Sequence, residues 1–191
     1  MENKIKNIIQ EALKVKQQLL EDSFMIEKIQ LAAEKITVAF KQGNRAYFCG
    51  NGGSAADAQH LAAEFSGRFY LDRDALPAEA LHCNTSYLTA VANDYGYNLA
   101  YSRLIKGIAR KGDVLIGLST SGNSENIIKA FETAKEKELI TIAFTGKSGG
   151  KLKAVSNIIF DIPSEDTPRI QEAHIMVGHI ICQLVEEKYF S

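Results

Sequence analysis

Two short loops rich in glycine and hydroxyl residues have the composition of a phosphate site. The first spans residues 48–54 (FCGNGGS) and the second spans residues 118–124 (LSTSGNS). Each follows an apolar run and precedes a helical pattern. Small residues let backbone N–H groups converge on an anion, and the N-terminus of the following helix adds partial positive charge. The second loop also offers hydroxyl groups that can donate to phosphate oxygens.

Neither loop is typical of a nucleotide site. Both lack the lysine of the nucleotide-triphosphate P-loop, and neither has the spacing G-x-G-x-x-G. We therefore expect the ligand to be a small phosphorylated metabolite.

A second candidate group lies on the helical stretch 54–65 that follows the first loop. His60 and Glu64 are four residues apart, so they face the same side of a helix. Such a pair can bind a metal, or the carboxylate can act as a base, although most isolated H-x-x-x-E matches are surface pairs without function. The phosphate loop at the start of this helix favours a functional pair. Ser54 and Asp57 fit the S-x-x-D pattern, which predicts that Asp57 caps the helix.

The last helical stretch, residues 168–189, carries further polar candidates. Thr167 is its predicted N-cap. The candidates are Gln171, Glu172, His174 and His179. Gln171 and His179 lie about 80° apart around a helix, whereas Glu172 and His179 align better. A histidine in an apolar helix is more often a hydrogen-bonded core residue than a ligand, so periodicity does not choose among them.

Two more charged residues have both a functional and a structural interpretation. Arg68 lies four residues after Glu64 and could clamp a phosphate or a sugar hydroxyl, or form an ion pair with Glu64. Asp94 lies in the turn-like segment 92–96 and could simply form that turn.

Composition indicates an ordinary globular domain. The chain has 191 residues, 46% hydrophobic and 24% charged, with a net charge of −1. This charge gives no reason to expect nucleic acid or an anionic membrane as a partner, and no apolar segment approaches bilayer length. The three cysteines have no metal-type spacing, which favours reduced thiols and a cytoplasmic location.

The pattern of elements predicts a parallel α/β sheet behind a helical lead-in. Residues 1–42 have helical periodicity, with a break expected near residues 21–23, and we expect them to pack on the domain and on another subunit. Residues 43–191 alternate between strands and helices, which indicates a sheet covered on both faces, a three-layer α-β-α sandwich. The predicted strands are Ala46–Cys49, Ala78–Leu81, Val114–Leu118, Ile140–Phe144 and Ile158–Ile162. Both phosphate loops then lie at the carboxyl edge of the sheet, where ligands bind.

Taken together, these residues closely resemble the phosphoheptose isomerases, which are sugar-isomerase (SIS) domain proteins. The resemblance is carried by residues 49–60 (CGNGGSAADAQH), 64–69 (EFSGRF), 92–97 (ANDYGY), 119–124 (STSGNS), 145–147 (TGK), 169–175 (RIQEAHI) and His179. It covers nearly the whole chain. The motif STSG alone indicates only a SIS domain, whereas the pairs His60/Glu64 and Gln171/His179 are more specific.

The resemblance implies one SIS domain with a flavodoxin-like sheet of five parallel strands. It also implies a homotetramer with active sites between subunits. The implied reaction converts sedoheptulose 7-phosphate to D-glycero-D-manno-heptose 7-phosphate through an enediol. That step begins the supply of activated heptose for bacterial surface polysaccharide, whether lipopolysaccharide core, capsule or glycoprotein.

The family's functional positions carry over residue by residue. His60, Glu64, Gln171 and His179 match a Zn²⁺ site, and Glu64 and His179 match the acid/base residues. Phosphate would be bound by Ser54, Ser119, Thr120, Ser121 and Ser124. The sugar would be held by Asn51, Gly52, Gly53, Arg68, Asn93 and Asp94. Two residues depart from the family. Asn84 lacks the negative charge that members often have there, and Pro168 removes a polar contact that acidic residues could make in some members.

Two other classes remain compatible with the resemblance. One is a non-catalytic SIS protein that binds the bacterial replication initiator; that relative has the fold and the tetramer but lacks the full catalytic set. The presence of both Glu64 and His179 favours an enzyme. The other is a SIS isomerase or sensor for another sugar phosphate.

Overall fold

A computed structural model describes all residues, 1–191. Two long helices open the chain, α1 (Glu2–Glu21) and α2 (Ser23–Lys41). Asp22 separates them and caps α2, because its Oδ1 accepts a hydrogen bond from the Met25 N–H at 3.1 Å. The break expected near residues 21–23 is therefore confirmed.

Five parallel strands form one sheet in the order β2-β1-β3-β4-β5. They are β1 (Ala46–Gly50), β2 (Ala78–Ala80), β3 (Val114–Leu118), β4 (Ile140–Gly146) and β5 (Ile158–Ile162). All four pairings are parallel, and Ala46 of β1 is in register with both Ala78 and Val114. The predicted strands and the parallel sheet are confirmed.

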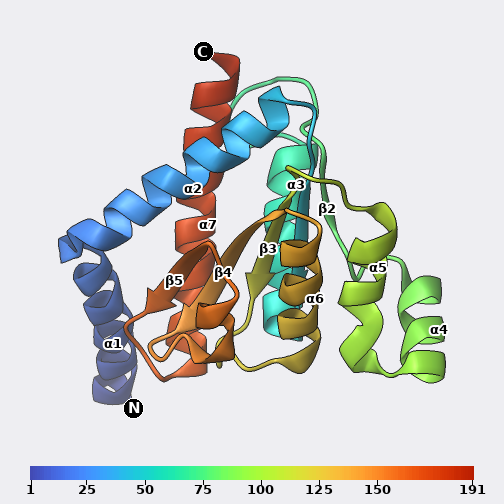
Figure 1. The fold of residues 1–191 in the computed structure, drawn as a ribbon. Helices are drawn as coiled ribbons and strands as arrows, with labels where there is room; N and C mark the ends of the chain where they lie inside the picture. Colours follow the sequence, from blue (N-terminus) through green and yellow to red (C-terminus); the bar gives the residue numbers. More distant parts are fainter.

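Helices cover both faces of the sheet (Figure 1). The remaining elements are α3 (Gly53–Ser66), α4 (Thr85–Tyr95), η1 (Tyr97–Leu99), α5 (Ala100–Ile108), α6 (Glu125–Glu136), η2 (Gly150–Ala154) and α7 (Thr167–Phe190). One layer contains α1, α2, α3 and α7, and the other contains α5, α6 and η2, with α4 packed outside α5. This is the expected three-layer sandwich.

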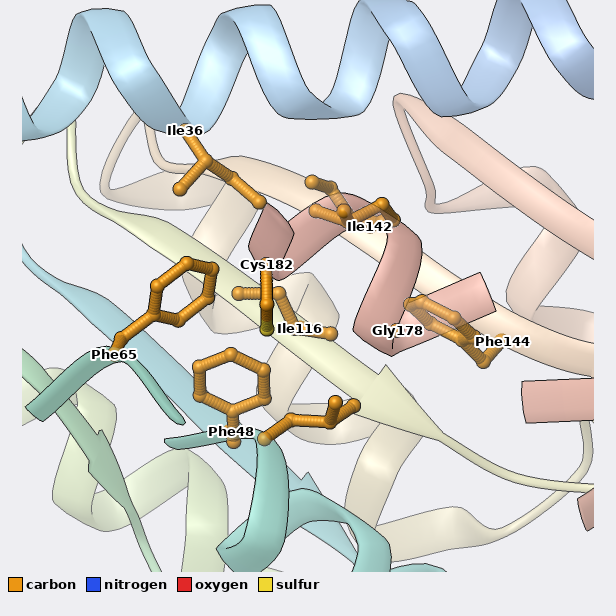
Figure 2. A pocket seen from close by; sticks show the side chains of 10 residues that line it. Ile36, Phe48, Phe65, Ile116, Ile142, Phe144, Gly178 and Cys182 are labelled. Atoms are coloured by element: carbon orange, nitrogen blue, oxygen red, sulfur yellow. The ribbon is translucent and has the colours of Figure 1, made fainter. Parts of the chain in front are cut away.

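The two layers share a sheet whose central strands are buried at every position. Side chains alternate between its faces: Phe48 belongs to the core on the α3 and α7 side, whereas Tyr47 and Cys49 belong to the core on the α5 and α6 side. Figure 2 shows the first core from inside, where Phe65 and Cys182 help to line a small apolar cavity. Burial raises the pKa of the Cys49 and Cys182 thiols, so both stay protonated as packing residues.

The predicted N-terminal caps of α7 and α3 are both wrong. The N-cap of α7 is Asp166, and Thr167 is already the first helical residue. Asp and Thr are both good N-caps, so the sequence alone did not separate them. The N-cap of α3 is Gly52, and no side chain caps that helix, so the capping box of Ser54 and Asp57 does not form.

The N-terminal helix leaves an apolar face exposed. Ile5, Ile8, Ile9 and Leu13 are 52%, 43%, 54% and 58% exposed. Their spacing of three, one and four residues places them on one side of α1. The chain's helices include none that is long and apolar enough to span a bilayer.

Candidate active site

The two phosphate loops meet where the connections of the sheet change sides. β1 and β3 are neighbours, but β1 leads into α3 on one face and β3 leads into α6 on the other. In a parallel sheet of order 2-1-3-4-5, this switch point opens a crevice at the carboxyl ends of the two strands. The predicted place of both loops is confirmed.

The first loop turns sharply and leaves the start of α3 free. Gly50 passes so close to the Ser54 carbonyl that a side chain at residue 50 would collide with it. Gly52 has φ +54°, a conformation that glycine adopts without strain. Because no side chain caps α3, its first backbone N–H groups remain available to an anion. Ser54, in the first turn, is buried.

The second loop gathers hydroxyl groups. The Oγ atoms of Ser119 and Ser124 lie 2.9 Å apart, and the Asn123 N–H donates to Ser121 Oγ at 3.1 Å. Gly122 has φ +64° and contacts the Gly149 backbone so closely that no Cβ fits. Thr120 and Ser121 line an open hollow that Lys147 also lines. The loop therefore offers donors and a nearby cation.

An amide pair ties the two loops together. Asn51 Nδ2 donates to Asn126 Oδ1 at 2.9 Å, and Asn126 Nδ2 donates to Asn51 Oδ1 at 2.8 Å. The Tyr97 hydroxyl donates to the same Asn51 oxygen at 2.9 Å, and the Tyr101 hydroxyl donates to the Gly50 carbonyl at 2.6 Å. Sequence reasoning assigned no role to Asn126, Tyr97 or Tyr101, because their partners lie 46 to 75 residues away.

A second group of side chains lies farther along α3. His60 Nε2 is 2.8 Å from Glu64 Oε1. The ring of His179, on α7, is 4.9 Å from the ring of His60 between centroids. One nitrogen of each imidazole and one oxygen of the Glu64 carboxylate all lie within 4.8 Å of one another. The structure thus brings together three of the residues that the sequence singled out.

This group could hold a metal. Two imidazole nitrogens and one carboxylate oxygen form a ligand set of catalytic zinc sites. His179 Nε2 is buried and has no hydrogen-bond partner in the chain. An unpartnered buried nitrogen beside His60 and Glu64 fits a ligand atom, since buried polar atoms are otherwise paired.

Asp57 belongs to the same surroundings. It precedes His60 by three residues and Glu64 by seven, so all three share a face of α3. Burial raises the pKa of the Asp57 carboxyl, while His60 and His179 act in the opposite direction. Because the sequence predicts a capping role for Asp57, it does not point to a place beside the histidines. The three-residue spacing between Asp57 and His60 is the signal that indicates this place.

Gln171 lies near the N-terminal end of α7, beside the start of α3. A Cβ on Gly53 would be 2.7 Å from Gln171 Nε2, so this amide touches the first loop at the start of α3. Eight residues separate Gln171 from His179, which is about 12 Å along a helix. Within one chain, Gln171 is therefore beside the phosphate loop and apart from the group of His60, Glu64 and His179.

The predicted sugar contacts Arg68, Asn93 and Asp94 lie outside the group of His60, Glu64 and His179. Arg68 is exposed and forms no ion pair, so its alternative pairing with Glu64 does not occur. Asn93 and Asp94 occupy the last turn of α4, where Asn93 Nδ2 donates to Asp94 Oδ1 at 2.8 Å. The turn interpretation of Asp94 is wrong, because the helix continues to Tyr95. Asn84 caps α4 by accepting from the Tyr87 N–H at 3.0 Å.

Comparison with known proteins agrees with this geometry. The model of the family described as SIS domain matches residues 9–146. A phosphoheptose isomerase of Clostridium acetobutylicum is 52% identical over 191 residues, which cover 100% of this chain and 97% of the relative. The chain belongs to the phosphoheptose isomerase family. Its sheet and helical lead-in are therefore those of a SIS-domain sugar-phosphate isomerase.

Solved structures of phosphoheptose isomerases have the same fold throughout. The enzyme of Neisseria gonorrhoeae superposes with a TM-score of 0.91 at 38% identity, covering 97% of this chain and 98% of that one. The enzyme of Francisella tularensis gives 0.92 at 31% identity, covering 97% of each chain. The structural similarity to phosphoheptose isomerases thus includes the N-terminal helices.

Proposed function

We propose that the protein isomerises sedoheptulose 7-phosphate to D-glycero-D-manno-heptose 7-phosphate, the first step of activated-heptose synthesis. The observation that carries the proposal is the placement of two sites along α3. The phosphate loop begins the helix at Gly53, and His60 and Glu64 lie seven and eleven residues later. His60 is therefore about 10 Å along the helix from the phosphate end. An open-chain heptose phosphate has a comparable length between its phosphate and its carbonyl carbon.

The phosphate end of the substrate is held by the two loops. Backbone N–H groups at the start of α3 and hydroxyls of the second loop donate to the phosphate oxygens. The proposed phosphate ligands are Ser54, Ser119, Thr120, Ser121 and Ser124. The proposed sugar contacts are Asn51, Gly52, Gly53, Arg68, Asn93, Asp94 and Gln171. Binding at this remote end orients the reacting carbons, which lowers the entropic part of the barrier.

The chemistry moves one proton between carbons and one between oxygens. Glu64 takes the proton from C1 of the ketose to give the enediol and returns it to C2. His179 transfers the proton between the two oxygens as the acid partner. The pair is adjacent because α3 and α7 pack side by side, and the 2.8 Å contact with His60 orients the Glu64 carboxylate.

The proposed metal is one Zn²⁺ per subunit. His60, Glu64 and His179 would hold it. Gln171 is the fourth proposed ligand, and it would come from a neighbouring subunit of the proposed tetramer, because within one chain it lies about 12 Å along α7 from His179. When bound, the ion supplies charge stabilisation at the carbonyl and enediolate oxygens.

The proposed assembly is a homotetramer with active sites between subunits. The exposed apolar face of α1, formed by Ile5, Ile8, Ile9 and Leu13, supports it. Burial of such a face stabilises association, since large exposed apolar patches mark interaction sites.

The proposal is tested by NMR of the zinc-replete protein with C5, C6 and C7 ketose phosphates side by side. Aldose signals from the C7 substrate alone support the assignment. Preference for a shorter sugar would favour another SIS isomerase. Binding without turnover, together with capture of the replication initiator, would favour the non-catalytic class.

A further inference from the structure

A buried ion pair joins α3, α7 and the segment that follows α3. Arg73 Nε donates to Glu186 Oε2 at 2.8 Å, and the two side chains are only 3% and 2% exposed. The Phe190 ring covers the guanidinium, with 5.4 Å between Arg73 Cζ and the ring centroid. Burying two charges costs free energy unless they are well paired and hydrogen-bonded, so stability alone does not explain this buried ion pair.

Arg73 binds the end of the helix that carries His60 and Glu64. One terminal nitrogen, Nη2, donates to the main-chain carbonyl of Glu64 at 2.8 Å. The other, Nη1, donates to the carbonyls of Phe65 at 2.8 Å and Gly67 at 3.2 Å. Carbonyls in the last turn of a helix lack partners within the helix, and a cation there also complements the helix dipole. Arg73 therefore fixes the backbone that carries the Glu64 side chain.

Glu186 fixes the packing around His179. It follows His179 by seven residues, two turns along the same face of α7. Its carboxylate accepts hydrogen bonds from the N–H groups of Phe69, Tyr70 and Leu71 at 3.2, 2.8 and 2.9 Å. The Phe69 ring in turn packs on the ring of His179, with 5.7 Å between centroids. Glu186 thus holds the segment that contacts His179.

We infer that Arg73 and Glu186 are positioning residues that hold Glu64 and His179 in reacting geometry. The inference rests on the proposed isomerase function for its kinetic part. Neither residue lies among the groups that contact substrate; one acts through the Glu64 backbone and the other through Phe69.

The test compares three variants with the wild-type protein. Arg73→Met with Glu186→Gln removes both charges, so no unpaired buried charge remains to unfold the chain. Arg73→Lys keeps the charge but lacks the planar fork that reaches several carbonyls. Lys111→Met with Glu138→Gln removes an ion pair whose side chains are 75% and 64% exposed, and serves as the matched control. Circular dichroism checks the fold, and Co²⁺ absorption reports metal binding without turnover.

The double variant at Arg73 and Glu186 should stay folded and lose about tenfold or more in kcat and in Co²⁺ affinity, as is typical when the partners that orient ligands are removed. KM should stay within about twofold of wild type, since the phosphate loops are untouched. Arg73→Lys should fall between wild type and the double variant. The control at Lys111 and Glu138 should match wild type.

A folded double variant with wild-type kcat and Co²⁺ affinity would overturn the inference, as would an effect on KM alone. If the double variant does not fold, Arg73→Lys decides by the same two readouts. If the wild-type protein does not convert the heptose phosphate, the proposed function fails. The Co²⁺ affinities of the variants, compared with wild type, still test whether Arg73 and Glu186 position Glu64 and His179.

Discussion

Gly178 on α7 packs directly on Leu61 of α3. A Cβ at residue 178 would lie 2.5 Å from Leu61 Cδ1, and Leu61 is only 1% exposed. His60 and His179 are the sequence neighbours of these two residues, and their rings are 4.9 Å apart between centroids. The missing side chain of Gly178 therefore sets how closely the two histidines approach.

Replacing Gly178 with alanine should separate the helices. The added methyl group collides with the buried Leu61 side chain, and overpacking of this kind costs about 1–3 kcal/mol. We expect a lower free energy of unfolding in urea and weaker Co²⁺ binding. A variant with wild-type values of both would contradict this account of the helix contact.

Gly107→Ala is the matched control for Gly178→Ala. Gly107 lies in α5, and nothing is within 4 Å of the place of its Cβ. Alanine in an open helical position stabilises by about 0.5–1 kcal/mol relative to glycine. This variant should be slightly more stable and unchanged in metal binding.

Asn126→Ala should weaken phosphate binding more than turnover. The change leaves Asn51 without its reciprocal amide partner and frees the first loop from the second. Loss of a partner from a buried polar group costs about 1–3 kcal/mol of stability. KM for the sugar phosphate should rise while kcat changes little, as steady-state kinetics would show. A fall in kcat at constant KM would assign Asn126 to the chemistry instead.

Asp57→Asn should weaken metal binding. His60 and His179 act electrostatically on the Asp57 carboxyl, so a charge on Asp57 favours a cation at their site. Neutralising it should lower Co²⁺ affinity several-fold, whereas Glu136→Gln, on the exposed face of α6, should not. Equal affinities of the two variants would show that Asp57 has no electrostatic part in the site.

The buried His174 should make stability fall as the pH is lowered. Burial lowers its pKa to about 4, and its Nε2 donates to the Thr145 carbonyl at 3.1 Å. A histidine in the unfolded chain has a pKa of about 6.5. Above that pH neither state binds the proton. Between pH 6.5 and about 4 only the unfolded state binds it, which removes roughly 3 kcal/mol of stability.

Urea unfolding at several pH values between 7 and 4 checks the role of His174. His174→Gln should show a smaller loss of stability than wild type over that range, because the proton-binding group is gone. Parallel curves for the two proteins would mean that His174 does not contribute to the pH dependence.

Local signals in the sequence were sufficient for most of the fold. Alternation of strands and helices placed β1 and β3, and Asp22 between two helical patterns marked the break before α2. The four-residue spacing of His60 and Glu64 placed them together. These features depend on neighbours in the chain, which periodicity and capping describe well.

The remaining features of the site depend on tertiary packing. Asn126 acquires its role only when α6 meets the first loop, and Gly178 only when α7 meets α3. The angle around the helix lets Gln171 and His179 share a side loosely, but the helical rise of about 12 Å separates them. His179 itself was assigned from the family resemblance, because an isolated histidine in an apolar helix carries no signal of its own.

Conversion of sedoheptulose 7-phosphate, followed by NMR with zinc-replete protein, tests the central claim most directly. The account predicts new anomeric signals of D-glycero-D-manno-heptose 7-phosphate with the wild-type protein. It predicts their loss, with sugar-phosphate binding retained, in Glu64→Gln and in His179→Gln. Absence of conversion by the wild-type protein, or near-normal turnover by Glu64→Gln, would contradict it.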